Sequence, residues 1–276
     1  MKAIDLSRWE LLLPSTPTDL NYLLSGADIG GGSLAGAAEN VRFESDGALT
    51  FIVPASETAQ GPDDMLACEL REFDDRVGAH GWNTSQGGYL SASLRINELP
   101  EARIGGEARI AIGRIMGSTG QMCVLYYDAG TLYITDSMDR RDGKPLRLDL
   151  RSVSGEATAI PLGERFDYFL KVSMSDFVVS VIHHGVTYSA RQELNDDWLG
   201  KVLHFNVGIG VLPGEVRGAA SASYYAISEP MVALARNADF GGALDDRNIV
   251  SAKVVLTLDD GGEVEIPLDW RASIRH

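Results

Sequence analysis

The stretch that decides the fold is HFNVGIGVL, residues 204–212, in which polar or small residues alternate with apolar ones. Because successive side chains of a strand point to opposite faces, Phe205, Val207 and Ile209 are expected to face a core. The other face would carry His204, Asn206, Gly208 and Gly210. Glycine inside a strand often marks the close approach of a ligand or of another backbone. The stretch therefore predicts a strand with one core side and one side suited to a site.

Two further segments have the same character, ACELRE at residues 67–72 and IGRIMG at residues 112–117. Alternation places Glu69 and Arg71 on one face of the first, and Arg114 and Met116 on one face of the second. If the three strands lie in one sheet, their polar faces gather Glu69, Arg71, Arg114, His204 and Asn206 over a shared surface. The alternative is that these are ordinary solvent-facing residues, with Glu69 and Arg71 paired to neighbouring strands.

Most of the remaining sequence also predicts short strands. Runs rich in Val, Ile, Tyr, Phe or Thr and bounded by Gly, Asp, Asn or Ser occur at residues 48–53, 89–96, 109–115, 123–127, 131–135, 166–173, 178–183, 202–209 and 220–227. Helical periodicity is scarce, with short candidates at Thr18–Leu23 and Gln192–Leu199. Many closely spaced strands with tight turns indicate an all-β protein, an antiparallel β-sandwich or jelly roll.

A tight turn is expected at His184-Gly185, between strand-like runs at Phe177–Ile182 and Val186–Ser189. His183 and His184 are neighbours there. Adjacent residues of a regular strand point to opposite faces, so the two imidazoles are not expected to share a metal ion, and a turn-and-surface role is predicted. No ligand-spaced histidine cluster is visible, and neither a metal nor another cofactor is expected.

The amino-acid composition of the chain changes near Pro230. Residues 237–246 form a Gly/Asp/Asn-rich connector, and residues 253–258 and 263–268 flank the turn sequence DDGG. This predicts a main domain at residues 1–230 and a linker with a C-terminal β-hairpin at residues 231–276. An isolated hairpin is marginal in water, so we expect it to pack on the main domain or on a partner chain, which would offer a route to a homo-oligomer.

Composition excludes several classes of function. The formal net charge of -15 and the absence of a Lys/Arg-dense stripe argue against nucleic acid as a partner. No stretch reaches the roughly 18 apolar residues of a membrane span. Two cysteines cannot make a disulfide framework, and Asp5, Arg8 and Glu10 interrupt the N-terminal apolar run. A cytoplasmic protein is therefore expected.

The three segments, together with the opening run DLSRWELLLP at residues 5–14, resemble polysaccharide lyase family 7, the alginate lyases. That family opens with D-L-S-x-W-x-L-x-L-P and carries the blocks R-[ST]-E-L-R, Q-[IV]-H and Y-F-K-A-G-x-Y-N-Q in this order. The closing run at residues 221–230 resembles the last strand of the family. The resemblance covers roughly residues 1–230 and implies a jelly-roll β-sandwich, concanavalin A-like, whose concave sheet forms a groove for a uronic-acid polysaccharide.

The resemblance also implies which residues stand at the catalytic positions. In the family, Arg and Gln neutralise the uronate carboxylate, while His and Tyr handle the protons of a β-elimination. Glu69 and Arg71 match the family. The departures are Ala67 for the first Arg, Arg114 for the Gln, Met116 for the His, Asn206 for the Lys and Gly210 for the Tyr.

Neither the thioether of Met116 nor Gly210, which has no side chain, can accept or donate a proton, so the family's lyase mechanism is not expected. Arg71 and Arg114 remain suited to a carboxylate, and His204 is the candidate for a relocated base. These three are the candidate catalytic residues, and Glu69, Asn206, Met116 and Gly210 are the candidate substrate-binding residues.

Three functions follow. The first is an alginate lyase-like protein that recognises an acidic (uronate) saccharide, with elimination weak, altered or lost. The second is a non-catalytic carbohydrate-binding relative. The third is an intracellular enzyme that uses the cleft for another small acidic metabolite. The net charge of -15 disfavours a long polyanion but not a single small acid.

Overall fold

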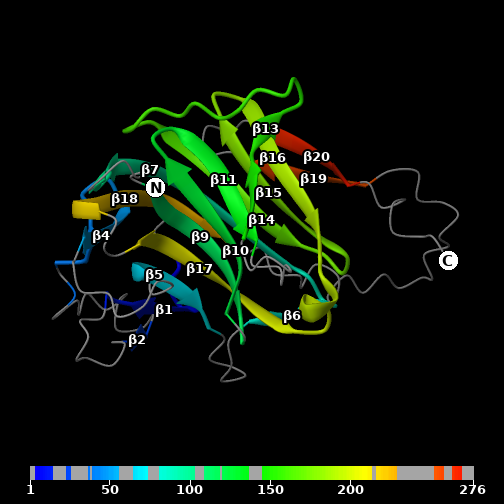
Figure 1. Ribbon diagram of the computed structural model, residues 1–276, viewed down its shortest axis with the longest axis horizontal. Coiled ribbons are helices and arrows are strands. Elements are labelled where there is room, and N and C mark those ends of the chain that lie inside the picture. The colour runs from blue at the N-terminus through cyan, green and yellow to red at the C-terminus, as the bar shows by residue number, and fades with distance from the viewer. Residues whose placement is uncertain are drawn as a thin grey trace, which may run out of the picture. The chain divides into compact units, whose positions relative to one another are not determined.

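The computed structural model describes residues 4–14, 23–25, 37, 39–55, 65–73, 81–102, 109–118, 120–136, 145–212, 216–228, 252–257 and 263–268. Contacts between Cα atoms divide the chain into two compact units, Met1–Val232 and Ala233–His276. The first unit contains the residues of all three segments discussed above, and it is built almost entirely of antiparallel strands (Figure 1).

Two nine-stranded sheets, called sheet A and sheet B, make up the first unit. Sheet A has the order β12-β11-β10-β9-β17-β5-β1-β2, and β6 also pairs with β17. Its strands are β1 (Trp9–Leu12), β2 (Leu23–Ser25), β5 (Leu66–Glu72), β6 (Trp82–Asn83), β9 (Arg109–Gly117), β10 (Gly120–Asp128), β11 (Thr131–Asp136), β12 (Leu146–Asp149) and β17 (Val202–Val211).

Sheet B has the order β13-β16-β15-β14-β7-β18-β4-β3, and β8 also pairs with β18. Its strands are β3 (Val41–Phe43), β4 (Leu49–Ala55), β7 (Gly88–Glu98), β8 (Glu101–Ala102), β13 (Arg151–Ser152), β14 (Arg165–Val172), β15 (Asp176–His183), β16 (Val186–Glu193) and β18 (Val216–Ser228). The predicted all-β fold is confirmed.

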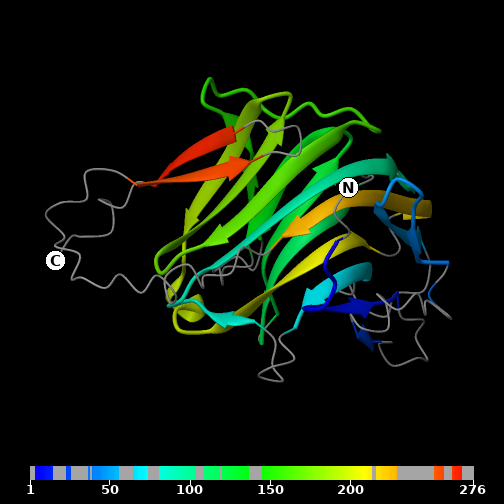
Figure 2. The same cartoon turned by 180° about the vertical axis from the view of Figure 1, so that it is seen from behind.

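The core lies between the two sheets, which are seen from either side in Figures 1 and 2. Phe205, Val207 and Ile209 of β17 and Leu70 of β5 are buried in one apolar cluster with residues of sheet B. The period-two alternation therefore assigned the inward faces of these strands correctly. Because one face is apolar, the residues between them must lie on the outer face of sheet A.

Two buried tyrosines of sheet B reach the backbone of sheet A. The register between β9 and β17 shifts between Val207 and Gly210, which marks a β-bulge. The hydroxyl of Tyr224 lies 2.8 Å from the carbonyl oxygen of Ile112 and 2.7 Å from that of Gly208. Tyr168 donates a hydrogen bond of 3.0 Å to the same Ile112 carbonyl. The two hydroxyl groups thus provide hydrogen bonds to backbone carbonyls at the irregular part of the β9–β17 pairing.

The helix expected at Gln192–Leu199 is wrong over most of its length. Its first residues continue strand β16, and only Asp196–Trp198 forms a 3-10 turn, capped by the side chain of Asn195. The expectation failed because the five polar residues within 192–197 are as compatible with a strand end and a capped turn as with a helix. Of the other candidate, Thr18–Leu23, only Leu23 is described, and it opens β2.

The expectation that His183 and His184 point to opposite faces is also wrong. The β15–β16 hairpin forms as predicted, but His184 adopts a φ of 49° in its turn. Alternation does not continue through a left-handed residue, and the two imidazole rings stack with their centroids 4.0 Å apart.

The second unit contains the predicted hairpin, β19 (Ala252–Thr257) paired antiparallel with β20 (Glu263–Leu268). Its packing on the main domain or on a partner chain stays a prediction. The connector at residues 237–246 lies outside the described residues. Among the described residues, no helix has the length and apolar character needed to cross a bilayer.

Candidate functional site

The predicted polar residues form a row across three neighbouring strands of sheet A. Asn206 on β17 is in register with Arg71 on β5 and with Arg114 on β9. Two residues before Arg71 on β5, Glu69 lies opposite Gly208 of β17. The expected gathering of these residues on one face is thus present in the geometry. We call Glu69, Arg71, Arg114 and Asn206 the polar row.

Glu69 accepts hydrogen bonds from two other residues of the polar row. Arg114 donates from Nε to Glu69 Oε2 at 3.0 Å and from Nη2 to Oε1, a bidentate ion pair. Asn206 donates from Nδ2 to the same Oε1. The side chains of Glu69 and Arg114 are only 4% and 11% exposed. The alternative of a solvent-facing pair is therefore right about the pairing and wrong about the exposure.

Gly208 makes room for this arrangement. A Cβ atom at position 208 would lie 2.3 Å from the carbonyl oxygen of Cys68 and 2.6 Å from the Cβ of Glu69. The residue has a φ of 153°. Glycine is required here because the backbone of β5 approaches closely, and the missing side chain lets Glu69 lean across β17 toward Arg114.

Arg71 has a different acidic partner, which sequence reasoning missed. Its Nη2 lies 3.1 Å from Oε2 of Glu10 on β1, the residue that stands opposite Arg71 in the register. Two arginines and two carboxylates therefore balance each other on this part of the face. Only the pairing of β1 with β5 reveals Glu10, and no local pattern in the sequence predicts which strands are neighbours.

Asn206 retains one acceptor for which the described residues provide no hydrogen bond. The residue is 3% exposed, and its Oδ1 is buried and lacks a partner within the described part of the chain. An unsatisfied buried acceptor costs about 1–3 kcal/mol, so such atoms are rare without a reason.

His204 and Met116 form the next row. They face each other across β17 and β9, two residues from Asn206 and from Arg114 on their own strands. His204 is half-buried, and it lies on the same outer face as Asn206 by alternation. The proposed relocated base thus stands beside the polar row. Its role stays a prediction.

Gly210 does not leave an open hollow. A Cβ atom there would lie 2.2 Å from Sδ of Met65, so the methionine side chain fills the space above the glycine. Met65 packs on a second apolar cluster of Ala111, Val124, Tyr126 and Tyr133. This cluster continues the outer face, and the Tyr126 and Tyr133 rings stack at 5.3 Å. Met65 was missed because it precedes β5 and nothing in the sequence indicates where its side chain turns.

The inner tyrosines cannot replace the missing base. Burial, and secondarily the charge of Glu69, raises the pKa of Tyr168. Burial is also the largest cause that raises the pKa of Tyr224, well above its ordinary value. Both hydroxyls stay protonated near neutral pH, and both are committed to backbone carbonyls. Their contribution is to fix the strands on which the polar row stands.

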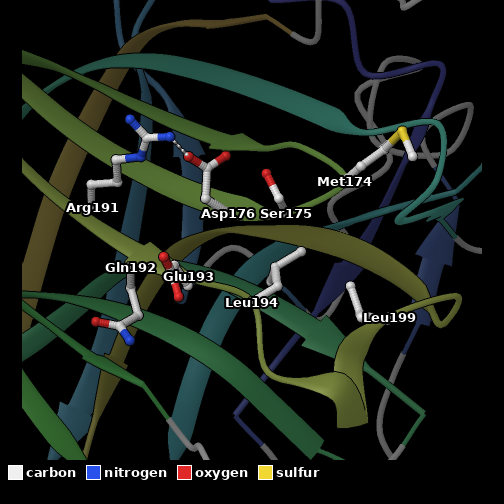
Figure 3. Close-up of a pocket in the computed structure, with 8 residues that line it drawn as sticks. All are labelled: Met174, Ser175, Asp176, Arg191, Gln192, Glu193, Leu194 and Leu199. Atoms are coloured by element: carbon white, nitrogen blue, oxygen red, sulfur yellow. Dashed lines mark ion pairs between the residues drawn. The ribbon is translucent and has the colours of Figure 1, made fainter. Parts of the chain in front are cut away.

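A separate hollow of about 670 Å³ lies at one edge of sheet B, where residues 174–176, residues 191–194 and Leu199 line it (Figure 3). None of these residues belongs to β5, β9 or β17. Asp176 and Arg191 form an ion pair across it, and Ser173 donates to Asp176. The hollow contains none of the residues selected from the sequence, whereas Asn206 of the polar row has a buried acceptor without a partner among the described residues, so the polar row remains the stronger candidate site.

The two antiparallel sheets packed face to face form a jelly-roll β-sandwich, with a polar row across β5, β17 and β9. Comparison with known proteins identifies the family. Residues 4–227 match the family model described as alginate lyase, which is most of the chain. The chain belongs to this alginate lyase family, and the predicted resemblance is confirmed.

Solved structures show the same fold. The alginate lyase from Klebsiella pneumoniae matches with a TM-score of 0.67 at 16% identity, covering 82% of this chain and 96% of that one. Alginate lyase A1-II′ of polysaccharide lyase family 7 matches with 0.64 at 22%, covering 82% and 95%. An alginate lyase from Pseudomonas aeruginosa matches with 0.63 at 22%, covering 82% and 98%. These likenesses establish the jelly-roll sandwich. The curated proteins give no match.

Proposed function

We propose that this protein binds an acidic oligosaccharide on the outer face of sheet A and has lost the form of β-elimination described for its family. The observation that carries the proposal is the polar row itself, with Asn206 in register between the guanidinium groups of Arg71 and Arg114. A uronic acid offers both chemistries that such a row recognises, a carboxylate for a guanidinium group and hydroxyls for an amide.

The relatives support the class of ligand. Alginate lyase A1-II′ has been crystallised in complex with an oligosaccharide product and, in another variant, with an oligosaccharide substrate. Arg71 is the residue of the row best placed to meet a ligand, because its side chain is 25% exposed while that of Arg114 is 11% exposed. The Oδ1 of Asn206, which has no partner among the described residues, is an acceptor suited to a sugar hydroxyl.

The loss of elimination follows from proton chemistry. Elimination needs a base near the C5 proton and positive charge where the enolate develops. Met116 and Gly210 supply no proton-transfer group, and Met65 occupies the space above Gly210. Arg114 is already neutralised by Glu69. Among the described residues at the family's catalytic positions and in the row beside them, His204 is the candidate base that remains.

Calorimetry and absorbance together test the proposal. Short oligomers of alginate and of glucuronan are titrated into the protein, and the ultraviolet absorbance of the unsaturated uronyl product is followed in parallel. We expect binding without product. Arg71→Ala should weaken binding about 10- to 100-fold, since a hydrogen bond to a charged group contributes about 1.5–3 kcal/mol.

Arg217→Ala is the matched control, because it removes another ion-paired arginine, exposed on β18 of sheet B. It should leave binding unchanged. The proposal is refuted if no uronate binds, or if the two variants behave alike. Product that disappears in His204→Ala would instead establish a relocated base and refute the loss of elimination.

One observation favours a second candidate, an enzyme or binding protein for a small acidic metabolite. Met65 and its apolar neighbours shorten the polar part of the face. A single carboxylate would need only the row, not an extended groove. Competition separates the two: monomeric uronate that binds as tightly as a tetramer favours the small ligand, whereas affinity that rises with chain length favours the oligosaccharide.

A further inference from the structure

A second cluster of functional groups lies in the other sheet. Glu164 directly precedes β14, His183 is the last residue of β15, and His184 lies in the turn into β16. Figure 1 shows these three neighbouring strands. One ligand atom from each of the three lies within 4.8 Å of the other two. No residue of this cluster belongs to sheet A, so it is independent of the proposed function.

The turn brings the two imidazoles together. His183 is buried at the rim of the sheet, as the inward alternation of β15 requires. The left-handed φ of 49° at His184 directs the His184 side chain to the same side as that of His183. Few residues other than glycine adopt this conformation, so its use at a histidine is unusual. The stacked rings both present Nε2 to Glu164.

The distances between the ligand atoms are compatible with coordination of one metal ion. His184 Nε2 lies 3.4 Å and His183 Nε2 2.7 Å from Oε2 of Glu164. Two donors on a tetrahedral zinc ion, each about 2.05 Å from it, are separated by about 3.3 Å. The first distance already fits. The second is a hydrogen bond that would open by roughly 0.6 Å when a metal ion replaces the shared proton.

The charge of Glu164 is also suitable. Within the described residues, its ion-pair partners are the two histidines. The neighbouring Arg165 points elsewhere, donating to Ser93 and lying over the ring of Tyr225. No Lys or Arg among the described residues pairs with the Glu164 carboxylate, so its oxygen is available to a cation held by the two imidazoles. His184 is 74% and Glu164 39% exposed, which leaves a path for the ion and for water ligands.

We propose that Glu164, His183 and His184 bind a divalent transition-metal ion of the zinc class. Two imidazole nitrogens and one carboxylate oxygen select such ions over Ca²⁺ and Mg²⁺, which prefer all-oxygen sites. The remaining coordination position is left to water. The bound ion would tie the β15–β16 turn to the start of β14.

Titration of the metal-free full chain with Zn²⁺ by calorimetry, and with Co²⁺ by visible absorption, tests the proposal. We expect one ion per chain at this site and a Co²⁺ spectrum of low coordination number. Saturation at about 100 times the dissociation constant should raise the thermal midpoint by about 5–10 °C.

Two variants test the ligands. His184→Gly keeps the left-handed backbone, and Glu164→Gln keeps a side chain of the same size. Changing an outer-shell partner costs about 10- to 100-fold in metal affinity, so loss of a ligand should cost at least about 100-fold. His276→Ala, which removes a histidine remote in the sequence, is the control and should bind as the parent does.

The site is refuted if the parent chain fails to bind Zn²⁺ or Co²⁺ at millimolar concentration. It is equally refuted if His184→Gly binds as tightly as the parent. The thermal midpoint of each variant in a chelator shows whether it folds. Glycine suits a positive φ, so His184→Gly should be at least as stable as the metal-free parent.

Discussion

Replacing Arg114 by glutamine removes the positive charge from its buried ion pair with Glu69 in sheet A. The variant removes the Nε–Oε2 hydrogen bond of 3.0 Å and its Nη2–Oε1 companion. Glu69, 4% exposed in its side chain, keeps only the hydrogen bond from Asn206. Breaking a buried pair on one side costs about 3–5 kcal/mol, because an uncompensated charge stays inside the protein.

The thermal midpoint should fall accordingly. In a domain of this size, each kcal/mol lowers the midpoint by about 2–4 °C, so Arg114→Gln is expected to lower it by about 6–20 °C. Glu69→Gln in the Arg114→Gln background removes the orphaned charge and should restore at least about 2 kcal/mol. The recovery distinguishes charge burial from loss of packing.

Chemical denaturation of the parent, both single variants and the double variant gives the coupling energy between the two residues. Arg42→Gln provides the control, since Arg42 and Glu44 form a comparable pair at 2.7 Å but are 59% and 37% exposed. That change should cost at most about 1 kcal/mol. A coupling energy within 0.5 kcal/mol of zero, or an Arg42→Gln cost equal to that of Arg114→Gln, would contradict the reasoning.

The other predictions concern stability and reactivity. Because burial raises the pKa of Tyr168 and Tyr224 above 10, the unfolded state releases these protons first, and stability should fall above pH 10 by up to about 1.4 kcal/mol per pH unit per group. Denaturant midpoints between pH 9 and 11.5 test this, and a flat profile would contradict it. Gly208→Ala should cost about 3 kcal/mol or more, against about 1–2 kcal/mol for Gly155→Ala, where φ is 86° and no atom lies within 4 Å of the added Cβ. Equal costs in denaturation would show that contact with β5 is unimportant. Both cysteines are buried, and burial raises the pKa of Cys68 well above its ordinary value. Ellman's reagent should therefore find no thiol in the native protein at pH 8 and two after denaturation, whereas rapid native labelling would mean that the core opens.

Much of the fold was predictable because alternation is a local property. The faces of Glu69 and Arg71, of Arg114 and Met116, and of His204 and Asn206 follow from a period of two, and the structure has each pair on one side of its strand. The residues that complete the site were not predictable in this way. Glu10 and Met65 reach the site from elements adjacent in space, and only the strand order brings them there.

Local rules failed where the backbone leaves the regular strand. At His184 a positive φ reverses the expected direction of the side chain. At Gly208 the sequence left open whether a ligand or a backbone approaches, and the answer is the backbone of β5. Both cases depend on conformations that glycine, or a strained residue, adopts for reasons set by its neighbours.

The hydroxyls of Tyr168 and Tyr224 separate the shape of sheet A from its chemistry. They hold the irregular β9–β17 ladder from the core side, through carbonyls rather than through any outward side chain. Exposed outward residues outside the buried Glu69–Arg114 pair can therefore be exchanged while these core-side hydrogen bonds stay in place. For protein engineering, the exposed positions of this face are therefore places where the surface chemistry can be changed without redesigning the packing between the two sheets.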